Sequence, residues 1–358
     1  MLQKKTFFAA LALAPFAVLA QSSSVTVFGV MDLSARYVKN EGAGSMKSLA
    51  SGNNATSRLG FKGSEDLGDG LSASFHLEAG LLADTGVNAS ATQFWDRRST
   101  VSLASTKLGE LRLGRDFVPT YLSWSRFDPF GYVGVASTSN LVSGTPVGPI
   151  RAAFGTGLNT AVRSSNAIQY LLPSGLGGVE GGVLVAAGEG GTAASGQDKM
   201  MSIRLGYISG PANFSAAIGT TENDVTANNK FRDSTFGGSY DFGVAKVNAA
   251  WRQFKMTTSK QTNLLIAATA PIGLGAVSLS YNRVNLDGKV GTVSIDANDV
   301  TQWGLGYVYN FSKRTVLYAS AAEIRNDGAA TFVIPGGPAI AGGGRTSTAF
   351  EAGVRHSF

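Results

Sequence analysis

The 358-residue sequence contains no cysteine and only two histidines, and charged residues make up 15% of it. Without cysteine the chain can form neither a disulfide nor a thiolate metal site, and it has no cysteine nucleophile. Beyond its N-terminus it also lacks any apolar run near the ~18 residues that a membrane-spanning helix needs. Glycine, in contrast, is frequent at 46 residues. That abundance is typical of a chain with many tight turns and closely packed strands.

The N-terminus has the pattern of a secretory signal peptide. Lys4 and Lys5 form a basic start, the segment 7–19 is apolar, and small residues follow it. The apolar segment is too short to cross a bilayer as a helix, and Pro15 interrupts it. We therefore expect residues 1–20 to be a signal peptide that is removed on export.

Residues 21–358 are expected to form a single domain with a modest basic excess. Its net charge is +4, because two of the lysines behind the chain's +6 lie in the leader. An excess of this size cannot by itself separate nucleic acid, an anionic membrane surface and anionic solutes as partners. Export argues against nucleic acid, so the first of these partners is not expected.

Short segments along this domain alternate apolar and polar residues with a period of two. In 25–37 the odd-numbered side chains are apolar or aromatic and most of the even-numbered ones are polar, and 71–78, 201–207 and 350–358 repeat the pattern. Such alternation is typical of strands with one apolar and one wet face. About sixteen segments of this kind follow one another, and short turns alternate with longer polar loops.

This layout predicts an all-β fold, a transmembrane antiparallel β-barrel of 16 strands with short periplasmic turns and long extracellular loops. A soluble β-sandwich also alternates and is the competing interpretation. Aromatic residues near the ends of the apolar faces favour the membrane, because such rings concentrate at membrane interfaces. Charges support the same choice, since most fall on the polar face and a charge on the lipid face costs roughly 2–4 kcal/mol at mid-bilayer. The polar-face arginines include Arg36, Arg58, Arg112, Arg204, Arg252, Arg325 and Arg355.

One long segment, Phe117 to about Gly155, has neither strand nor helix periodicity. An aperiodic loop of this length within a compact domain is usually functional. We interpret it as a segment that folds into the barrel and narrows its bore.

Several motifs carry a family resemblance. The opening SSVTVFGVMD, the segment SRLGFKGSEDLGDGLSASFHLE, the run LGELRLGRDF, the stretch RSSNAIQY and the terminal Phe358 occur in that order. In them the chain resembles the Gram-negative general porins, most closely the anion-preferring members. The resemblance implies a trimer of 16-stranded barrels in the outer membrane that passes small hydrophilic solutes. It also implies a third extracellular loop folded inward at about 116–155, and recognition of Phe358 by the barrel-insertion machinery.

The resemblance further implies a constriction with arginines on the wall and acidic residues on or near the inward loop. Arg58 is the arginine of SRLGF. The next arginine is Arg97 or Arg98. The motif aligns best with Arg97, and this choice turns Thr100 and Ser102 outward, where their small side chains would suit a subunit interface. If the apolar Val101 and Leu103 face outward instead, Arg98 points inward. Candidates for a third position are Arg151 and Arg163, and the acidic candidates are Glu78, Asp116 and Asp128.

Clustered guanidiniums opposite carboxylates would give a transverse field, and an excess of positive charge lowers the barrier for anions. The expected function is therefore a passive, weakly anion-selective pore without enzymatic activity, cofactor or metal. One alternative is an outer-membrane adhesin or structural barrel without an open pore. Another is a barrel hydrolase using His76, but no motif spacing supports a catalytic triad.

Overall fold

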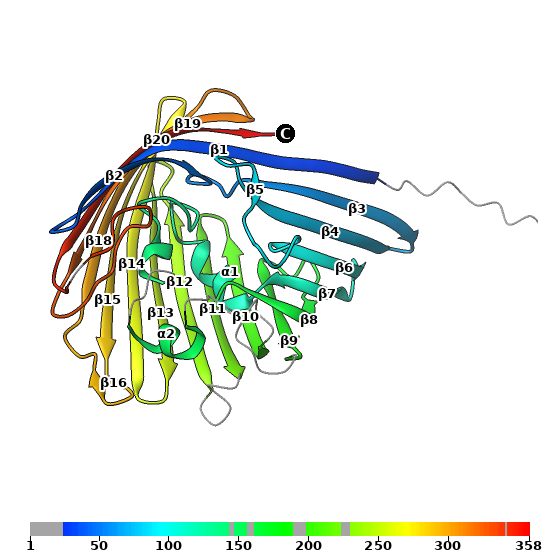
Figure 1. The fold of residues 1–358 in the computed structure, drawn as a ribbon. Helices are drawn as coiled ribbons and strands as arrows, with labels where there is room; N and C mark the ends of the chain where they lie inside the picture. Colours follow the sequence, from blue (N-terminus) through cyan, green and yellow to red (C-terminus); the bar gives the residue numbers. More distant parts are fainter. Residues whose placement is uncertain (1–23, 143–146, 156–160, 189–197, 223–229, 341) are drawn as a thin grey trace, which may run out of the picture.

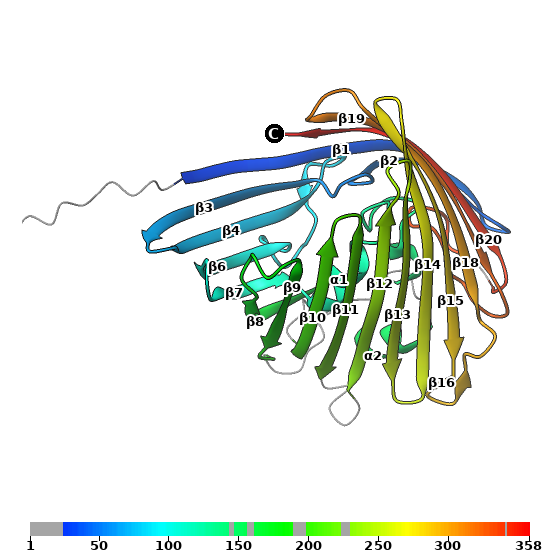
Figure 2. The same ribbon diagram turned by 180° about the vertical axis from the view of Figure 1, so that it is seen from behind.

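The computed structural model describes residues 24–142, 147–155, 161–188, 198–222, 230–340 and 342–358. The expected signal peptide, residues 1–20, lies outside these ranges. Strands dominate and form a closed antiparallel barrel of 16 strands (Figures 1 and 2). The barrel closes where the first strand, β1 (Ser24–Asn40), pairs with the last, β20 (Thr346–Ser357). Within the described ranges, no helix is long and apolar enough to cross a membrane.

Each neighbouring pair in the wall is antiparallel, as expected for a chain that goes up and down. The second wall strand has two parts, β2 (Gly44–Ser51) and β3 (Arg58–Gly68). They pair with the C-terminal and N-terminal halves of β1, respectively. The other wall strands are β4 (Leu71–Leu82), β6 (Arg98–Ser105), β7 (Gly109–Phe117), β8 (Arg163–Leu171), β9 (Val179–Ala186), β10 (Lys199–Ser209), β11 (Ala212–Glu222), β12 (Phe231–Asp241), β13 (Lys246–Met256), β14 (Ser259–Ile272), β15 (Gly275–Asp287), β18 (Val300–Asn310) and β19 (Thr315–Asn326). The remaining strands, β5 (Val87–Asn88), β16 (Lys289–Val290) and β17 (Val293–Ser294), are two-residue pieces in loops.

The outer and inner faces of the wall are sorted by polarity. On β1, Val25 and Val27 are 68% and 55% exposed on the outside, whereas Asp32 is fully buried on the inside. This sorting confirms the transmembrane barrel and rejects a soluble sandwich, in which the apolar face would be covered. Two details differ from the expectation. Thr100 and Ser102 face inward. Arg325 lies on the outer face beside Glu323, because Ile324, the residue between these two, is the one that is buried inside.

The β7–β8 connection lies against the inner face of the wall. It contains α1 (Pro119–Ser125), the 3-10 helix η1 (Thr138–Leu141) and α2 (Pro149–Phe154). Helix α1 contacts β10, β11 and β12, and α2 contacts β13 and β14 (Figure 1). The segment therefore crosses the interior, whereas the expected range 116–155 begins two residues too early, since Asp116 and Phe117 still belong to β7.

An apolar patch on the inner wall explains why this loop packs inward. Trp124, Phe127 and Phe154 of the loop form one buried cluster with Phe231 and Phe254 of β12 and β13. The inner face of a membrane barrel that encloses water is normally polar, so these inward phenylalanines need a cover. Gly237 of β12 assists the packing, because a Cβ there would lie 2.5 Å from the Phe127 ring.

Hydrogen bonds fix the same loop at several points. The Val135 amide donates to the Glu351 carboxylate at 3.0 Å, and the Gln302 side chain donates to the carbonyl of Ser137 at 2.9 Å. Where the loop returns to the wall, Arg252 donates to the Ala161 carbonyl at 2.9 Å. The loop is thus attached to β13, β18 and β20 as well as by its own ends.

Candidate functional site

Arginines gather on the inner wall formed by β3 to β8. We call this group the wall cluster. Its basic members are Arg58, Arg97, Arg98, Arg112, Arg115 and Arg163, and its acidic members are Glu78, Asp96, Glu110 and Asp116. Alternation along β6 and β7 places Arg98 and Arg112 inside, because their neighbours Val101, Leu111 and Leu113 are exposed on the outside.

Glu78 on β4 is the first acidic centre of the wall cluster. Its carboxylate accepts from Arg97 and lies 3.9 Å from the Arg58 guanidinium and 3.4 Å from the His76 ring. The register pairs Arg58 with Gly80 and Glu78 with Arg98, so these side chains come from three adjacent strands. One carboxylate therefore faces two arginines, which leaves net positive charge at this point.

Asp116 on β7 is the second acidic centre. Arg112 donates to it at 2.7 Å and lies 2.8 Å from Glu110, while Arg98 approaches it at 3.4 Å. Only 4% of the Asp116 side chain is exposed, so its charge is directed at these two arginines rather than at the lumen.

Arg163 is the least compensated member of the wall cluster. Its guanidinium lies over the Phe117 ring, 4.3 Å from the centroid, and that ring stacks on Tyr121 at 5.0 Å. Among the described residues, no carboxylate lies within 4 Å of it. Burial raises the pKa of Tyr121, partly opposed by Arg163 and Arg97, so this phenol is neutral at physiological pH. Arg163 therefore presents a positive charge held by aromatic rings rather than by acids.

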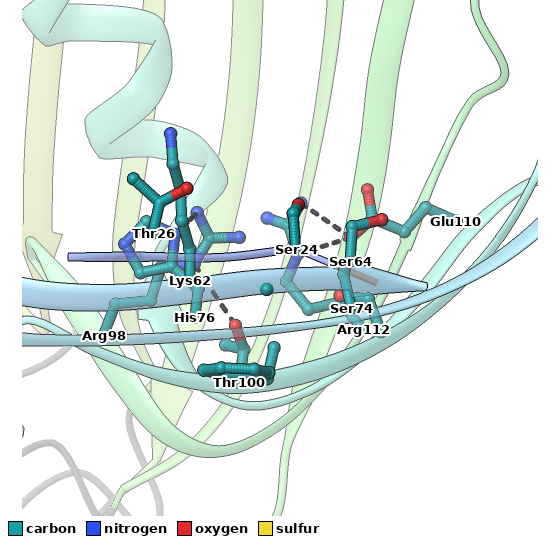
Figure 3. Close-up of a pocket in the computed structure, with 13 residues that line it drawn as sticks. Ser24, Thr26, Lys62, Ser64, Ser74, His76, Arg98, Thr100, Glu110 and Arg112 are labelled. Atoms are coloured by element: carbon teal, nitrogen blue, oxygen red, sulfur yellow. Dashed lines mark hydrogen bonds and ion pairs between the residues drawn. The ribbon is translucent and has the colours of Figure 1, made fainter. Parts of the chain in front are cut away.

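A hydroxyl-lined recess of about 290 Å³ extends from the wall cluster toward the short-turn end of the barrel. Figure 3 shows Lys62, His76 and Arg98 near one end and Glu110 and Arg112 near the other. Between them the lining hydroxyls come from Ser24, Thr26, Ser64, Ser74, Thr100 and Ser102. Cations combined with neutral hydroxyls can hold a small anion loosely, which suits transit better than tight binding.

Two predicted site residues lie elsewhere. Arg151 is exposed on α2, which packs against β13 and β14 rather than against β3 to β8. Asp128 is buried within the loop, where its carboxylate accepts from the amides of Phe130 and Thr138 at 2.9 Å and from the Thr138 hydroxyl at 2.7 Å. Burial raises the pKa of Asp128 despite these bonds. Neither residue faces the wall cluster: Asp128 organises the loop instead.

Both alternatives for the second arginine are in the wall cluster. Arg98 points inward with Thr100, to which its Nε donates at 3.3 Å. Arg97 precedes β6 and turns back to Glu78. The argument that favoured Arg97 on outward Thr100 and Ser102 was wrong, since both face the interior.

Sequence reasoning missed Arg115 and Arg126. A β-bulge between Gly114 and Asp116 shifts the register, so Arg115 also reaches inward, donating to the Asp96 carbonyl at 2.6 Å. The signal was Gly114 within a strand, since such a glycine often marks a bulge. Arg126 follows α1 and pairs with Glu180 at 2.6 Å, as does Arg204.

His76, the residue of the hydrolase alternative, lies beside the wall cluster. His76 contacts Glu78 and Arg98, and within the described ranges no serine hydroxyl hydrogen bonds to its ring. The same ranges contain no group of three His, Asp or Glu side chains that could hold a metal ion.

Comparisons with known proteins place these features in context. A family model described as Gram-negative porin matches residues 8–329. The chain is 36% identical over 372 residues to outer membrane porin protein 32 of Delftia acidovorans, covering 99% of this chain and 100% of that relative. An anion-selective porin from Comamonas acidovorans has a similar structure, with a TM-score of 0.79 and 34% identity over 94% of this chain and 100% of that one. OmpF of Salmonella typhi in complex with daunomycin shares the fold at 15% identity, with a TM-score of 0.64 over 93% of this chain and 97% of that one.

Proposed function

Because the chain belongs to the Gram-negative porin family and is an outer-membrane porin, we propose that its pore prefers small anions. The observation that carries this proposal is the wall cluster, in which six arginines face four carboxylates. Arginine stays charged at any relevant pH, so the excess is permanent. A relative of similar structure is an anion-selective porin, which supports the same conclusion.

We assign the constriction to the gap between the wall cluster and the β7–β8 loop. Arg58, Arg97, Arg98 and Arg163 form the basic wall, and Glu78 and Asp116 moderate it. Screening limits the field to roughly 8 Å at physiological salt, so only solutes in the narrow zone sense it. Selectivity is therefore weak, and neutral hydrophilic solutes pass as well.

Reversal potentials in a salt gradient across a planar bilayer test the proposal. An anion about 5 Å from one guanidinium gains about 0.8 kcal/mol in water, or about half of that after screening at 0.15 M salt. Replacing Arg58 or Arg163 with glutamine should thus lower the anion-to-cation permeability ratio about two- to fourfold. The matched control is Arg283→Gln, because Arg283 lies on the outer face beside Asp299. A cation-preferring wild type, or an equal change in the control, would refute the assignment. Negligible conductance would instead favour a plugged structural barrel.

The remaining proposals concern assembly. Residues 1–20 act as the signal peptide, and 21–358 form one barrel that assembles as a homotrimer surrounded by outer-membrane lipid. Phe358 is the aromatic group presented to the insertion machinery: it closes the barrel seam by exchanging backbone hydrogen bonds of 3.1 Å with Gly29 and leaves its ring half exposed on the outside. Pulse-labelled export of Phe358→Ala measures this role as slower appearance of the heat-resistant trimer.

A further inference from the structure

The outer face of β12, β13 and β14 carries two parallel rows of side chains near the long-loop rim. The strand register pairs Arg232 with Lys255 and Lys255 with Lys260, which gives a cationic row. Four residues further along each strand, toward the middle of the membrane, the register pairs Phe236 with Trp251 and Trp251 with Leu264. These three side chains form an apolar row. Adjacent strands are about 4.8 Å apart and the rise is about 3.3 Å per residue, so each row is about 10 Å wide and the rows are about 13 Å apart.

Both rows point away from the lumen. Phe236 and Leu264 are 58% and 41% exposed, whereas the residues of opposite parity, such as Asp233 and Phe254, are buried inside. The β13–β14 connection at this rim is the tight turn 257–258, so no long loop from that pair rises over the cationic row. Figure 2 shows these three strands side by side in the barrel wall.

The cationic row has fewer acids than cations around it. Lys260 lies 3.2 Å from Asp287, but within the described ranges neither Arg232 nor Lys255 makes an ion pair. Next to the row, Lys230 and Lys199 share Glu222 at 2.5 and 3.9 Å. Five cations thus face two carboxylates on one outer surface, and positive charge remains for an external anion.

A groove connects this charge to an apolar surface. It has a volume of about 400 Å³ and lies over β10, β11 and β12, with Met201, Ile203 and Ile218 among its lining residues and Lys230 and Arg232 at its loop end. A molecule that fills it must therefore be apolar along most of its length and anionic at one end. That description fits a membrane lipid in the leaflet beside the long loops, which is the outer leaflet.

We propose that the cationic row and this groove bind a phosphate-bearing lipid of the outer leaflet. The acyl chain lies in the groove over Ile203 and Ile218, and the phosphate oxygens accept from Arg232 and Lys255. Arginine suits phosphate because its planar guanidinium donates two parallel hydrogen bonds. Basic residues just beyond an aromatic or apolar belt attract anionic headgroups in the same way.

Native mass spectrometry of the barrel in detergent tests the proposal with bisphosphorylated lipid A as the probe. The triple variant R232Q/K255Q/K260Q should lose at least about tenfold in lipid affinity, since each basic residue contributes several-fold near an anionic surface. The matched control, K107Q/K313Q/R314Q, removes the same charge from exposed positions at the short-turn rim and should bind like wild type. The single variant R232Q should lose less lipid affinity than the triple variant.

Further arms of the experiment separate the lipid from other ligands. Dephosphorylated lipid A should bind wild type and the triple variant equally weakly, and excess inorganic pyrophosphate should not replace the lipid. Unchanged conductance of the triple variant keeps this result independent of pore selectivity. The proposal is overturned if the triple variant binds like wild type, if the control loses as much, if the dephosphorylated lipid binds wild type as tightly, or if pyrophosphate alone displaces the lipid.

Discussion

The buried pair Arg252–Asp233 offers a sharp test of how the β7–β8 loop is held. Arg252 is fully buried, lies 2.7 Å from Asp233, stacks over Phe254 and donates to the Ala161 carbonyl. Replacing Arg252 with methionine leaves the Asp233 carboxylate buried without its partner. Breaking such a pair costs about 3–5 kcal/mol, so we expect the single variant to lose this much free energy of unfolding.

The double variant R252M/D233L should be more stable than the single one. Its side chains match the apolar surroundings that Phe231 and Phe254 provide, and such replacements of buried pairs are often neutral or stabilising. The remaining loss is the Ala161 hydrogen bond, about 1 kcal/mol. Tryptophan fluorescence during guanidinium unfolding in lipid vesicles measures all three proteins. Additive losses, with the double variant less stable than R252M, would refute the view that an uncompensated charge dominates.

Three further predictions follow from the loop and the wall cluster. Glu78→Gln removes the carboxylate beside Arg58 and should raise the anion-to-cation permeability ratio about two- to fourfold, measured by reversal potential. Gly237→Val would push against Phe127, so it should lower the free energy of unfolding by about 1–3 kcal/mol in the same guanidinium assay. Burial raises the pKa of Asp128, so the protonated carboxyl stabilises the folded loop. This stabilisation is fully present below the pKa of an ordinary aspartate and is lost as the pH rises through the pKa of Asp128 in the folded protein. Open-channel noise should therefore fall as pH is lowered from 7 to 4 in wild type but less so in Asp128→Asn, and equal pH profiles would contradict this role.

The barrel could be predicted because strand alternation is a local property of the sequence. One apolar face per strand is enough to require lipid outside, and the observed exposure of Val25 and Val27 follows the predicted face. The inward arginines Arg58 and Arg98 follow from the same parity. These predictions needed no knowledge of which strands are neighbours.

Features that depend on register or on interruptions of it could not be predicted in this way. The bulge at Gly114 brings Arg115 inward although simple alternation places it outside. Buried Ile324 reverses the expected face of Arg325, because the inner wall there is apolar and covered by loops. Asp128 looked like a pore acid on sequence grounds, but loop folding buries it with three hydrogen-bond donors.

The inner wall has an apolar part that loops cover and a charged part that they leave open. Inward apolar residues such as Phe231, Phe254 and Ile324 lie on β12, β13 and β19, and loops pack over them. Covering apolar surface stabilises the loop in this half, so the water-filled path is left beside β3 to β8. That half carries the wall cluster and the hydroxyl-lined recess below it. With the constriction placed as proposed, the loop would do more than narrow the bore, because by occupying the apolar half it would direct solutes toward the arginines of the wall cluster.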